Sequence, residues 1–394
     1  SRDWSSDVCS SDLDAGTGQL QVLATGTQGG NGHLTLGSGL VAVSGVQRTA
    51  LTAAGSVVLS GTGGLTAPGD VTLSAQSLTA SSGAQSQITA RDGTLAIQPT
   101  ALTGGSAATP GAGAAVTLNA AQVVHSGKVD LPSGKLVINA DQSVQLASGS
   151  TTNLAGYTKK IDDVTLTTVG GSLQVRAASG DITLASGSVV DVSAATGGSS
   201  TAGSMSFSAP NGTVALQGRL VATSAAGQTG GSLSVDSASA INLTDLAQRL
   251  AAENSASLSN FAQSIAVRNR QGNQSLAEGT TLQAQKLSLS ADAGQLTVQG
   301  SLLANGSTAG DSVALSAGQD VVVGSGAVIE AKATTGGAGG QVSLASASGT
   351  IRLSGGSIDT SGASADNGTV SLRALRNGND VQVDAIQTTL SGVK

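Results

Sequence analysis

Hydrophobic and polar residues alternate in short segments along most of the chain. In the stretch from 172 to 203, SLQVRAASGDITLASGSVVDVSAATGGSSTAG, three such segments follow one another and glycines separate them. Their apolar positions are Leu173, Val175 and Ala177, then Ile182 and Leu184, then Val190 and Val192. Side chains at i and i+2 of a strand share a face, so each segment has one small apolar face and one polar face. No segment can bury its apolar face alone, and we therefore expect successive copies to stack.

The spacing of the copies can be followed from the first apolar position of each one. These positions are Leu173, Met205, Leu233, Leu287, Val313, Val342 and Val370. The steps between them are similar in length, except that the step from Leu233 to Leu287 is close to twice the others. A second segment follows at Ile182, Val214, Ile241, Leu296, Val321, Ile351 and Val381. The pattern predicts a coil with three strand segments and about 28 residues per turn, a period typical of solenoid repeats.

The long step contains a segment with a different pattern. Residues 244–263, TDLAQRLAAENSASLSNFAQ, carry spaced leucines and several alanines, with no glycine or proline. Thr244 is the expected N-cap, and Asp245 in the first turn favours the helix dipole. We predict a helical excursion here, either to cover a flank of the coil or to act as a recognition element. The chain is expected to return to the coil near Ile265.

The predicted fold class is therefore all-β: a right-handed parallel β-helix, or solenoid, with a short helical insertion. Residues 14–394 are interpreted as a single repeat domain that is irregular over 14–115, where glycine-rich turns such as 61–64 separate the strands. A low-complexity loop is expected at 101–114. The strand pairs predicted before the regular copies are Leu34/Leu36, Val57/Leu59, Val71/Leu73, Leu95/Ile97, Val116/Leu118, Leu136/Ile138, Val144/Leu146 and Val164/Leu166.

Composition supports an ordered β-structure without a conventional aromatic core. The chain has 394 residues, 56 glycines and 5 prolines, with 1% aromatic and 11% charged residues. A disordered glycine/serine linker has a similar composition, but disorder gives no reason for apolar residues to keep a fixed parity. The net charge is −6 and no basic stripe with aromatic residues occurs, so nucleic-acid binding is not expected. There is also no apolar run of the roughly 18 residues needed for a membrane-spanning helix.

Residues 1–13 do not fit the repeat. Asp3 to Leu13, DWSSDVCSSDL, match the peptide encoded by one reading frame of a common sequencing-library adapter, and they contain the only Trp and the only Cys. We interpret this segment as an artefact, the alternative being a genuine polar leader, and expect the chain to be an internal fragment of a longer protein. Without it the chain has no cysteine, as in a secreted bacterial solenoid that relies on stacking instead of disulfides.

Residues that could support catalysis are few and dispersed. His33 and His125 are far apart in the repeat order and are both predicted to be surface turn residues. A zinc site has neither a cysteine pair nor a histidine cluster to use. The Gly-Ser-Gly sequences at 37–39 and 324–326 lack the strand, elbow and helix of a nucleophile motif. The sequence Gly336–Gly340 lacks the aspartate of a calcium-binding repeat. These patterns are interpreted as turns or surface positions.

Charged pairs are candidate catalytic groups because some parallel β-helices are polysaccharide lyases or hydrolases. Asp162 and Asp163 are adjacent, so on a strand they would point to opposite faces, a poor geometry for paired carboxylates. The basic pairs Arg268/Arg270 and Arg373/Arg376 are interpreted as solvated charge. We predict no catalytic, cofactor-binding or metal-binding residues, no cofactor, and no enzyme activity.

The repeats resemble those of filamentous haemagglutinin-like large exoproteins. The resemblance is carried by SLQVRAASGDITLASGS, GGQVSLASASGTIRLSGGS and GTVSLRALRNGNDVQV, and it covers most of residues 14–394. It implies a right-handed β-helix, export by an outer-membrane two-partner-secretion transporter, and action as an adhesin. The NPNL and NPNGI-type motifs of that family's secretion domain have no match in this chain.

The leading hypothesis is the structural shaft of a secreted or surface-tethered bacterial adhesin. Its partners would be the transporter and glycans or proteins on host or bacterial surfaces or in a biofilm matrix. Two alternatives remain: the stalk of a contact-dependent toxin delivery exoprotein, and a β-helical polysaccharide-active enzyme. Reading the parent gene in both directions would separate them.

Overall fold

The computed structural model is nearly all-β, with 53% of the residues in strands and 3% in helix. It describes residues 13–14, 18–26, 30–196, 200–225, 227–228, 230–255, 258–306, 309–363, 366–378 and 380–394. The adapter-like segment therefore lies outside the described residues, apart from the backbone of Leu13. The chain divides into two compact units, residues 1–228 and 229–394. The single repeat domain over 14–394 stays a prediction.

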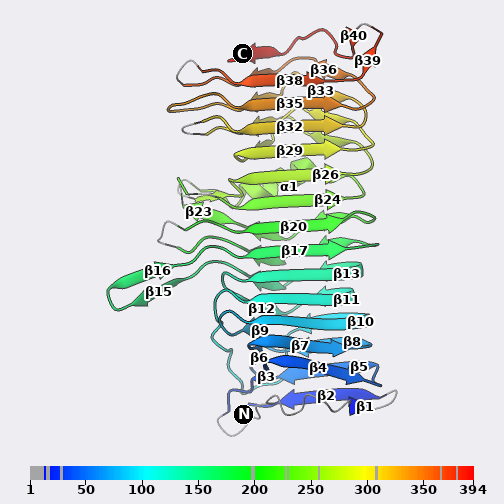
Figure 1. Cartoon of the computed structure of the whole chain (residues 1–394), viewed down its shortest axis with the longest axis vertical. Helices are drawn as coiled ribbons and strands as arrows, with labels where there is room; N and C mark the ends of the chain where they lie inside the picture. The colour runs from blue at the N-terminus through cyan, green and yellow to red at the C-terminus, as the bar shows by residue number, and fades with distance from the viewer. Residues whose placement is uncertain are drawn as a thin grey trace. The chain divides into compact units, whose positions relative to one another are not determined.

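In unit 1, one turn of the coil consists of three strands, which define its three sides (Figure 1). Side 1 is β17 (Ser172–Ala177), side 2 is β18 (Ile182–Leu184) and side 3 is β19 (Val189–Asp191). The next turn repeats them as β20 (Ser204–Ala209), β21 (Val214–Leu216) and β22 (Arg219–Val221). Each strand pairs in parallel with its counterpart one turn on. The predicted parallel β-helix with three segments per turn is confirmed, and the hand of the coil stays a prediction.

The earlier turns of unit 1 use the same three sides. Side 1 contains β1 (Leu13–Asp14), β4 (Gly39–Ser44) and β7 (Thr62–Ala67), and side 2 contains β2 (Gln19–Ala24), β5 (Arg48–Ala53) and β8 (Asp70–Ser74). The long strands β10 (Gln85–Gln98), β11 (Ala115–His125) and β13 (Lys135–Leu146) run through both sides. Side 3 contains β3 (Leu34–Leu36), β6 (Ser56–Leu59), β9 (Ser77–Ala80), β12 (Lys128–Asp130) and β14 (Thr151–Asn153). Strand β23 (Thr223–Ala225) lies near the end of the unit.

The region predicted to be irregular is thus built from stacked turns. The strand pairs predicted before residue 100 are all present, but residues 62–64 belong to β7 and do not form a turn. Glycine is needed in this strand because a Cβ at Gly63 would collide with the carbonyl oxygen of Gly39, and one at Gly64 with that of Gln87. The sequence looked irregular because glycine replaces apolar residues where two backbones approach closely.

Turn length in unit 1 varies more than the repeat spacing predicted. Val116 pairs with Leu136, and Leu136 pairs with Leu173, so a short turn is followed by a long one. The second turn is long because it includes an antiparallel hairpin, β15 (Thr158–Ile161) and β16 (Val164–Thr167). Val164 and Leu166 were expected to continue the coil, and this was wrong: both are exposed and both lie in the hairpin.

Unit 2 follows the same plan. Side 1 contains β24 (Ser232–Ser237), β26 (Ser264–Asn269), β29 (Lys286–Ala291), β32 (Ser312–Ala317), β35 (Gln341–Ser346) and β38 (Thr369–Arg373). Side 2 contains β27 (Gln274–Leu276), β30 (Leu296–Val298), β33 (Val321–Val323) and β36 (Ile351–Leu353). Side 3 contains β28 (Thr281–Gln283), β31 (Ser301–Leu303), β34 (Val328–Glu330), β37 (Ser357–Asp359) and β41 (Thr389–Ser391). The remaining short strands are β25 (Leu258–Asn260), β39 (Arg376–Asn377) and β40 (Asp380–Val381).

The long step from Leu233 to Leu287 contains two turns of the coil. Ile265 pairs with Leu233 on one side and with Leu287 on the other, so it is the first apolar position of a turn in its own right. The turn that begins at Leu233 is the longer of the two because it includes the helical segment. The repeat spacing missed the second turn because Ile265 directly follows that segment.

The predicted helix is present but shorter than expected. Helix α1 spans Leu243–Ala251, and its N-cap is Asn242, whose side chain accepts a hydrogen bond from the backbone N–H of Asp245. Thr244, the predicted N-cap, lies inside the first turn. Four residues of α1 are buried: Leu243, Leu246, Ala247 and Leu250. The helix contacts β27 and β28, and it occupies the part of its turn where other turns place their side-2 and side-3 strands.

The core of each coil consists of columns of inward side chains, and each turn contributes one side chain to a column. On side 1 of unit 1, Ile88, Leu118, Ile138, Val175 and Phe207 pair in register and are all at most 2% exposed. Adjacent strands lie about 4.8 Å apart, so each side chain packs directly on the next. Small aliphatic side chains suffice for such a column, which explains why the chain needs few aromatic residues.

Candidate functional site

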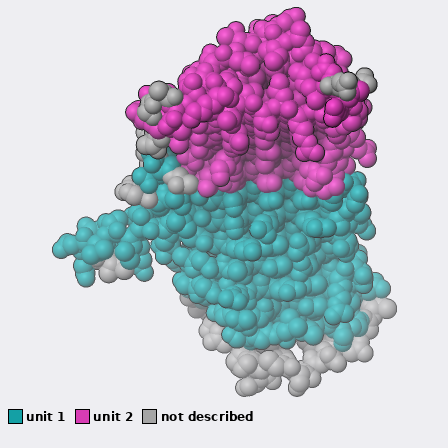
Figure 2. Space-filling view, turned by 45° about the horizontal axis from the view of Figure 1, so that its top comes forward, with its two compact units in different colours: residues 1–228 teal, residues 229–394 magenta. Residues whose placement is uncertain are grey.

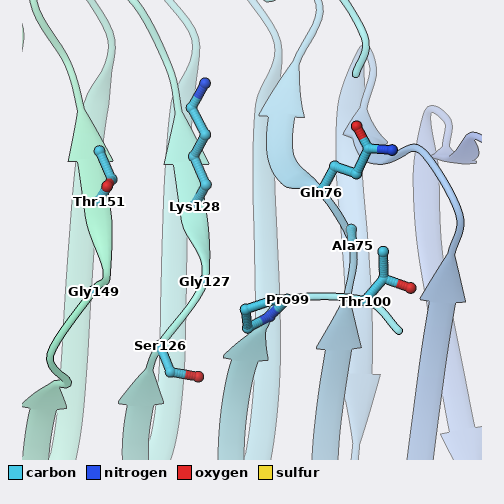
Figure 3. Close-up of a pocket in the computed structure, with 9 residues that line it drawn as sticks. All are labelled: Ala75, Gln76, Pro99, Thr100, Ser126, Gly127, Lys128, Gly149 and Thr151. Carbon is cyan, nitrogen blue, oxygen red and sulfur yellow. The ribbon is translucent and has the colours of Figure 1, made fainter. Parts of the chain in front are cut away.

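The corner between sides 2 and 3 of unit 1 contains a recess of about 330 Å³. It forms because β10 ends at Gln98 and the next residues, 99–114, supply no side-3 strand. Strand β9 pairs directly with β12, Leu78 opposite Val129, although a whole turn separates them in sequence. Figure 3 shows the chain passing from Pro99 to Thr100 across this corner. The recess is lined by Ala75, Gln76, Pro99, Thr100, Ser126, Gly127, Lys128, Gly149 and Thr151.

The polar groups around this recess are largely engaged by the coil itself. The ammonium of Lys128 lies 2.8 Å from the Asp130 carboxylate. The Ser126 hydroxyl donates to the carbonyl of Ile97 at 3.3 Å. Gln76 donates to the carbonyls of Ala54 and Gly105 at 2.9 and 3.0 Å. The arrangement can offer hydroxyl and amide groups to a small polar molecule, but it does not place a nucleophile beside a base.

His125 lies next to this corner, and its prediction as a surface residue was wrong. It ends β11, stacks between Ile97 and Leu146, and is 1% exposed. Nε2 is 3.3 Å from the carbonyl oxygen of Thr151, and Nδ1 has no hydrogen-bond partner among the residues that the structure describes. Burial disfavours the charged imidazolium and lowers the pKa of His125 to about 4. Its parity with the buried Val123 two residues earlier is the sequence signal that identifies it as inward-facing.

The other histidine and the glycine motifs have structural roles. The backbone N–H of Ser56 donates to Nδ1 of His33 at 3.1 Å, which joins one turn to the next. Residues 324–326 lie between β33 and β34, as predicted for a turn, whereas of residues 37–39 only the first two lie between β3 and β4, and Gly39 begins β4. Residues 336–340 lie in the loop before β35.

The acidic pair and the first basic pair are not brought together as a site. Asp162 and Asp163 form the exposed turn of the β15–β16 hairpin. Arg268 lies 2.6 Å from Asp292 in the following turn, while Arg270 lies 2.8 Å from Asp236 in the preceding turn. The two arginines therefore link three successive turns.

The pKa of Asp292 reflects this pairing. Partial burial raises it, but hydrogen bonds from Arg268 and Ser290 outweigh the burial and hold the pKa below its usual value. Asp292 is therefore a carboxylate at neutral pH, which suits a structural ion pair between turns.

Arg373 and Arg376 line a second recess, of about 420 Å³, in unit 2. The Nε–H of Arg376 donates to the carbonyl of Gly378 at 3.0 Å. The other lining residues are small or aliphatic: Ser316, Ala317, Ala345, Ser346, Ala347, Ala374 and Leu375. Within the described residues, no group of three or more His, Cys, Asp or Glu side chains could hold a metal ion.

In comparisons with known proteins, no family model, no curated protein and no solved structure matches the chain. In the part of the chain that the structure describes, no helix has the length and apolar character needed to span a bilayer. The class that the fold defines is the parallel β-helix repeat proteins.

Proposed function

We propose that this chain is the structural shaft of a secreted or surface-tethered bacterial adhesin. The main observation in support is that the repeats preserve their inward, packing side chains. On side 1 of unit 2, inward positions keep similar aliphatic side chains, while the outward positions beside them differ in chemistry and include arginine, serine and alanine. The inward series is Val267, Leu289, Leu315 and Leu344, and the outward series is Arg268, Ser290, Ser316 and Ala345.

This pattern fits a protein whose repeats maintain packing. In a stacked repeat, each turn contacts its neighbours, and each added turn extends the stack by about 4.8 Å. A shaft of this kind can change length by gain or loss of turns without losing its core. The resemblance of the repeats to filamentous haemagglutinin-like exoproteins supports the remaining parts of the proposal: export through an outer-membrane two-partner-secretion transporter, and contact with glycans or proteins on host cells, other bacteria or the biofilm matrix.

Deletion of whole turns in the source bacterium tests the proposal. Removal of residues 286–340 joins Gln285 to Gln341 and leaves the side-1 register intact, because Lys286, Ser312 and Gln341 are equivalent positions. A shaft predicts that this variant remains on the cell surface and retains adhesion to cells and to biofilm matrix. The control deletion, 286–326, joins Gln285 to Ala327 and brings a side-3 strand into a side-1 position, so surface display should be lost.

Loss of adhesion by the whole-turn variant, with surface display unchanged, would place the binding residues in the deleted turns and contradict a shaft. The enzyme alternative makes a separate prediction. Depolymerisation of a polysaccharide by the purified chain would replace the structural proposal with a catalytic one.

A further inference from the structure

The hairpin β15–β16 of unit 1 leaves the coil and forms a two-stranded sheet of its own. Its antiparallel register places Thr158 opposite Thr167 and Ile161 opposite Val164. Asp162 and Asp163 form the turn, and Asp162 has a φ of 49°. Figure 2 shows this hairpin as a teal projection that extends away from the coil of unit 1. The coil is complete without it, because side 1 resumes at β17 in register with β13.

The base of the hairpin is tied to the coil by hydrogen bonds that converge on Thr168. The backbone N–H of Tyr157 donates to the Thr168 hydroxyl oxygen at 2.8 Å, and the Ser133 hydroxyl donates to the same atom at 2.7 Å. The Thr158 hydroxyl donates to the carbonyl of Thr196 at 2.8 Å. These bonds hold the direction in which the hairpin projects, and a partner therefore meets a partly pre-organised element.

One face of the hairpin presents two exposed apolar side chains beside a lysine. Residues directly opposite one another share a face, so Leu166 and Val164 lie on one face together with Lys159, and Lys160 and Thr165 lie on the other. Val164 is 59% exposed and Leu166 is 50% exposed. A two-stranded sheet is only marginally stable by itself, and an uncovered apolar face on it marks an interaction surface.

The hairpin is positively charged before Ile161 and negatively charged after it. Lys159 and Lys160 come before it, Asp162 and Asp163 after it, and all four charged residues are exposed. None of them takes part in an ion pair within the described residues. A segment with this order of charges is complementary to a second copy of itself in the antiparallel orientation.

We propose that the β15–β16 hairpin is a self-association element through which two copies of this chain pair about a two-fold axis. A two-fold interface needs a surface that is complementary to itself. With the hairpins antiparallel, Val164 and Leu166 of one copy pack on the same residues of the other. The lysine pair and the acidic turn of one hairpin are roughly 7–13 Å apart along the strand. In the antiparallel pair, the acidic turn of each hairpin therefore lies beside the lysine pair of its partner.

The interface is small, and this sets the expected strength. A hairpin of this size buries less than the roughly 800 Å² per partner typical of stable complexes, so a single contact should have a micromolar or weaker dissociation constant. Lateral pairing goes beyond the shaft function and does not depend on it, since a shaft can act singly.

Charge-reversed variants of the full chain test the pairing. Sedimentation velocity is recorded from about 1 µM to about 1 mM, the range that such a small interface requires. The wild type should shift to the dimer with rising concentration. Lys159→Asp/Lys160→Asp and Asp162→Lys/Asp163→Lys should each stay monomeric, and an equimolar mixture of the two should dimerise. Val164→Ser/Leu166→Ser should remain monomeric alone and in every mixture.

A matched control separates charge from position. Asp141→Lys reverses an exposed charge elsewhere in unit 1 and should dimerise as the wild type does. Circular dichroism melts should be unchanged in all variants, because the altered side chains are exposed.

A wild type that is monomeric throughout, charge variants that associate like the wild type, or a mixture that stays monomeric would each overturn the proposal. Binding of a monomeric wild type to anionic vesicles, lost in Val164→Ser/Leu166→Ser, would assign the apolar face to lipid and overturn it as well.

Discussion

Two segments interrupt side 3 of the coil, and they do so in different ways. In unit 1, residues 99–114 leave the stack and the strands on either side pair directly across the gap. In unit 2, α1 takes the place of both the side-2 and the side-3 strand of its turn and buries four residues of its own against the coil. Side 1 contributes a strand to the turn that contains each interruption. Both interruptions include side 3, and the one in unit 2 extends over side 2 as well.

The two segments are also attached by different forces. The loop at 99–114 lies on earlier turns through backbone contacts: Gly111 donates to the carbonyl of Ala80 at 2.8 Å, and Ala108 donates to the Ser56 hydroxyl at 2.9 Å. A Cβ at Gly105 would collide with the backbone of Ala54 and Gly55, so the loop needs glycine to approach closely. The helix relies on apolar packing. Added side-chain bulk at a close backbone contact should therefore destabilise the loop, whereas loss of a buried apolar side chain should destabilise the helix.

The largest loss of unfolding free energy is expected from a substitution in a side-2 strand of unit 1, away from both interruptions. Leu184 is fully buried and its strand pairs with strands in the preceding and the following turn. Leu184→Pro removes a ladder donor and a core side chain, and should cost at least about 4 kcal/mol of unfolding free energy. Ala101→Pro, in the loop that has left the ladder, should change it by less than about 1 kcal/mol. Denaturant unfolding followed by circular dichroism measures both, and equal effects would contradict the assignment of these segments.

The helix should be sensitive to loss of its buried leucines. Leu250 is 5% exposed, and Leu250→Ala should lower the unfolding free energy by about 2–4 kcal/mol, from lost burial plus a cavity. The exposed neighbour provides the control: Gln248→Ala should change stability by less than about 0.5 kcal/mol. If the two variants have the same melting temperature, α1 is not packed on the coil.

His125 should make unit 1 sensitive to mild acid. Its pKa is about 4 in the folded chain against 6.5 in the unfolded one, so between these values the unfolded chain binds more protons. The contribution of the neutral, buried His125 to the unfolding free energy is complete above pH 6.5 and falls as the pH drops toward 4. The total loss should be about 3 kcal/mol. His125→Leu should remove this part of the pH dependence, and identical profiles from pH 7 to 4.5 for the two proteins would contradict the buried position.

The smallest effect is expected in the loop, where the backbone approaches the coil. Gly105→Val should cost about 1–3 kcal/mol because its side chain has no room beside Ala54. Ala107→Val, at an exposed position of the same loop, should cost less than about 0.5 kcal/mol. A thermal melt measures both, and a loop that tolerates both equally does not lie on the earlier turns.

Alternation alone predicted most of the strands and the three segments per turn, because packing in a β-helix depends on the parity of each position. It could not separate the hairpin at Val164 from a coil strand, since parallel and antiparallel strands alternate in the same way. His125 was missed because residue type was given more weight than its parity with Val123. Asn242 and Thr244 are both acceptable N-caps, and the contacts of α1 with the coil decide between them. No sequence pattern predicted the corner recess, which exists only because two distant strands pair.

The distance between spin labels at Ser234 and Ser343 tests the stacked coil most directly. These outward positions of unit 2 are far apart in sequence but are linked by four parallel pairings, through Ala266, Ser288 and Ala314. With Cys9 replaced by Ser, double electron–electron resonance should give a narrow distribution near 19 Å, four strand spacings of about 4.8 Å. A broad distribution centred at roughly 55–60 Å, as expected for a flexible chain between these two positions, would contradict the parallel β-helix.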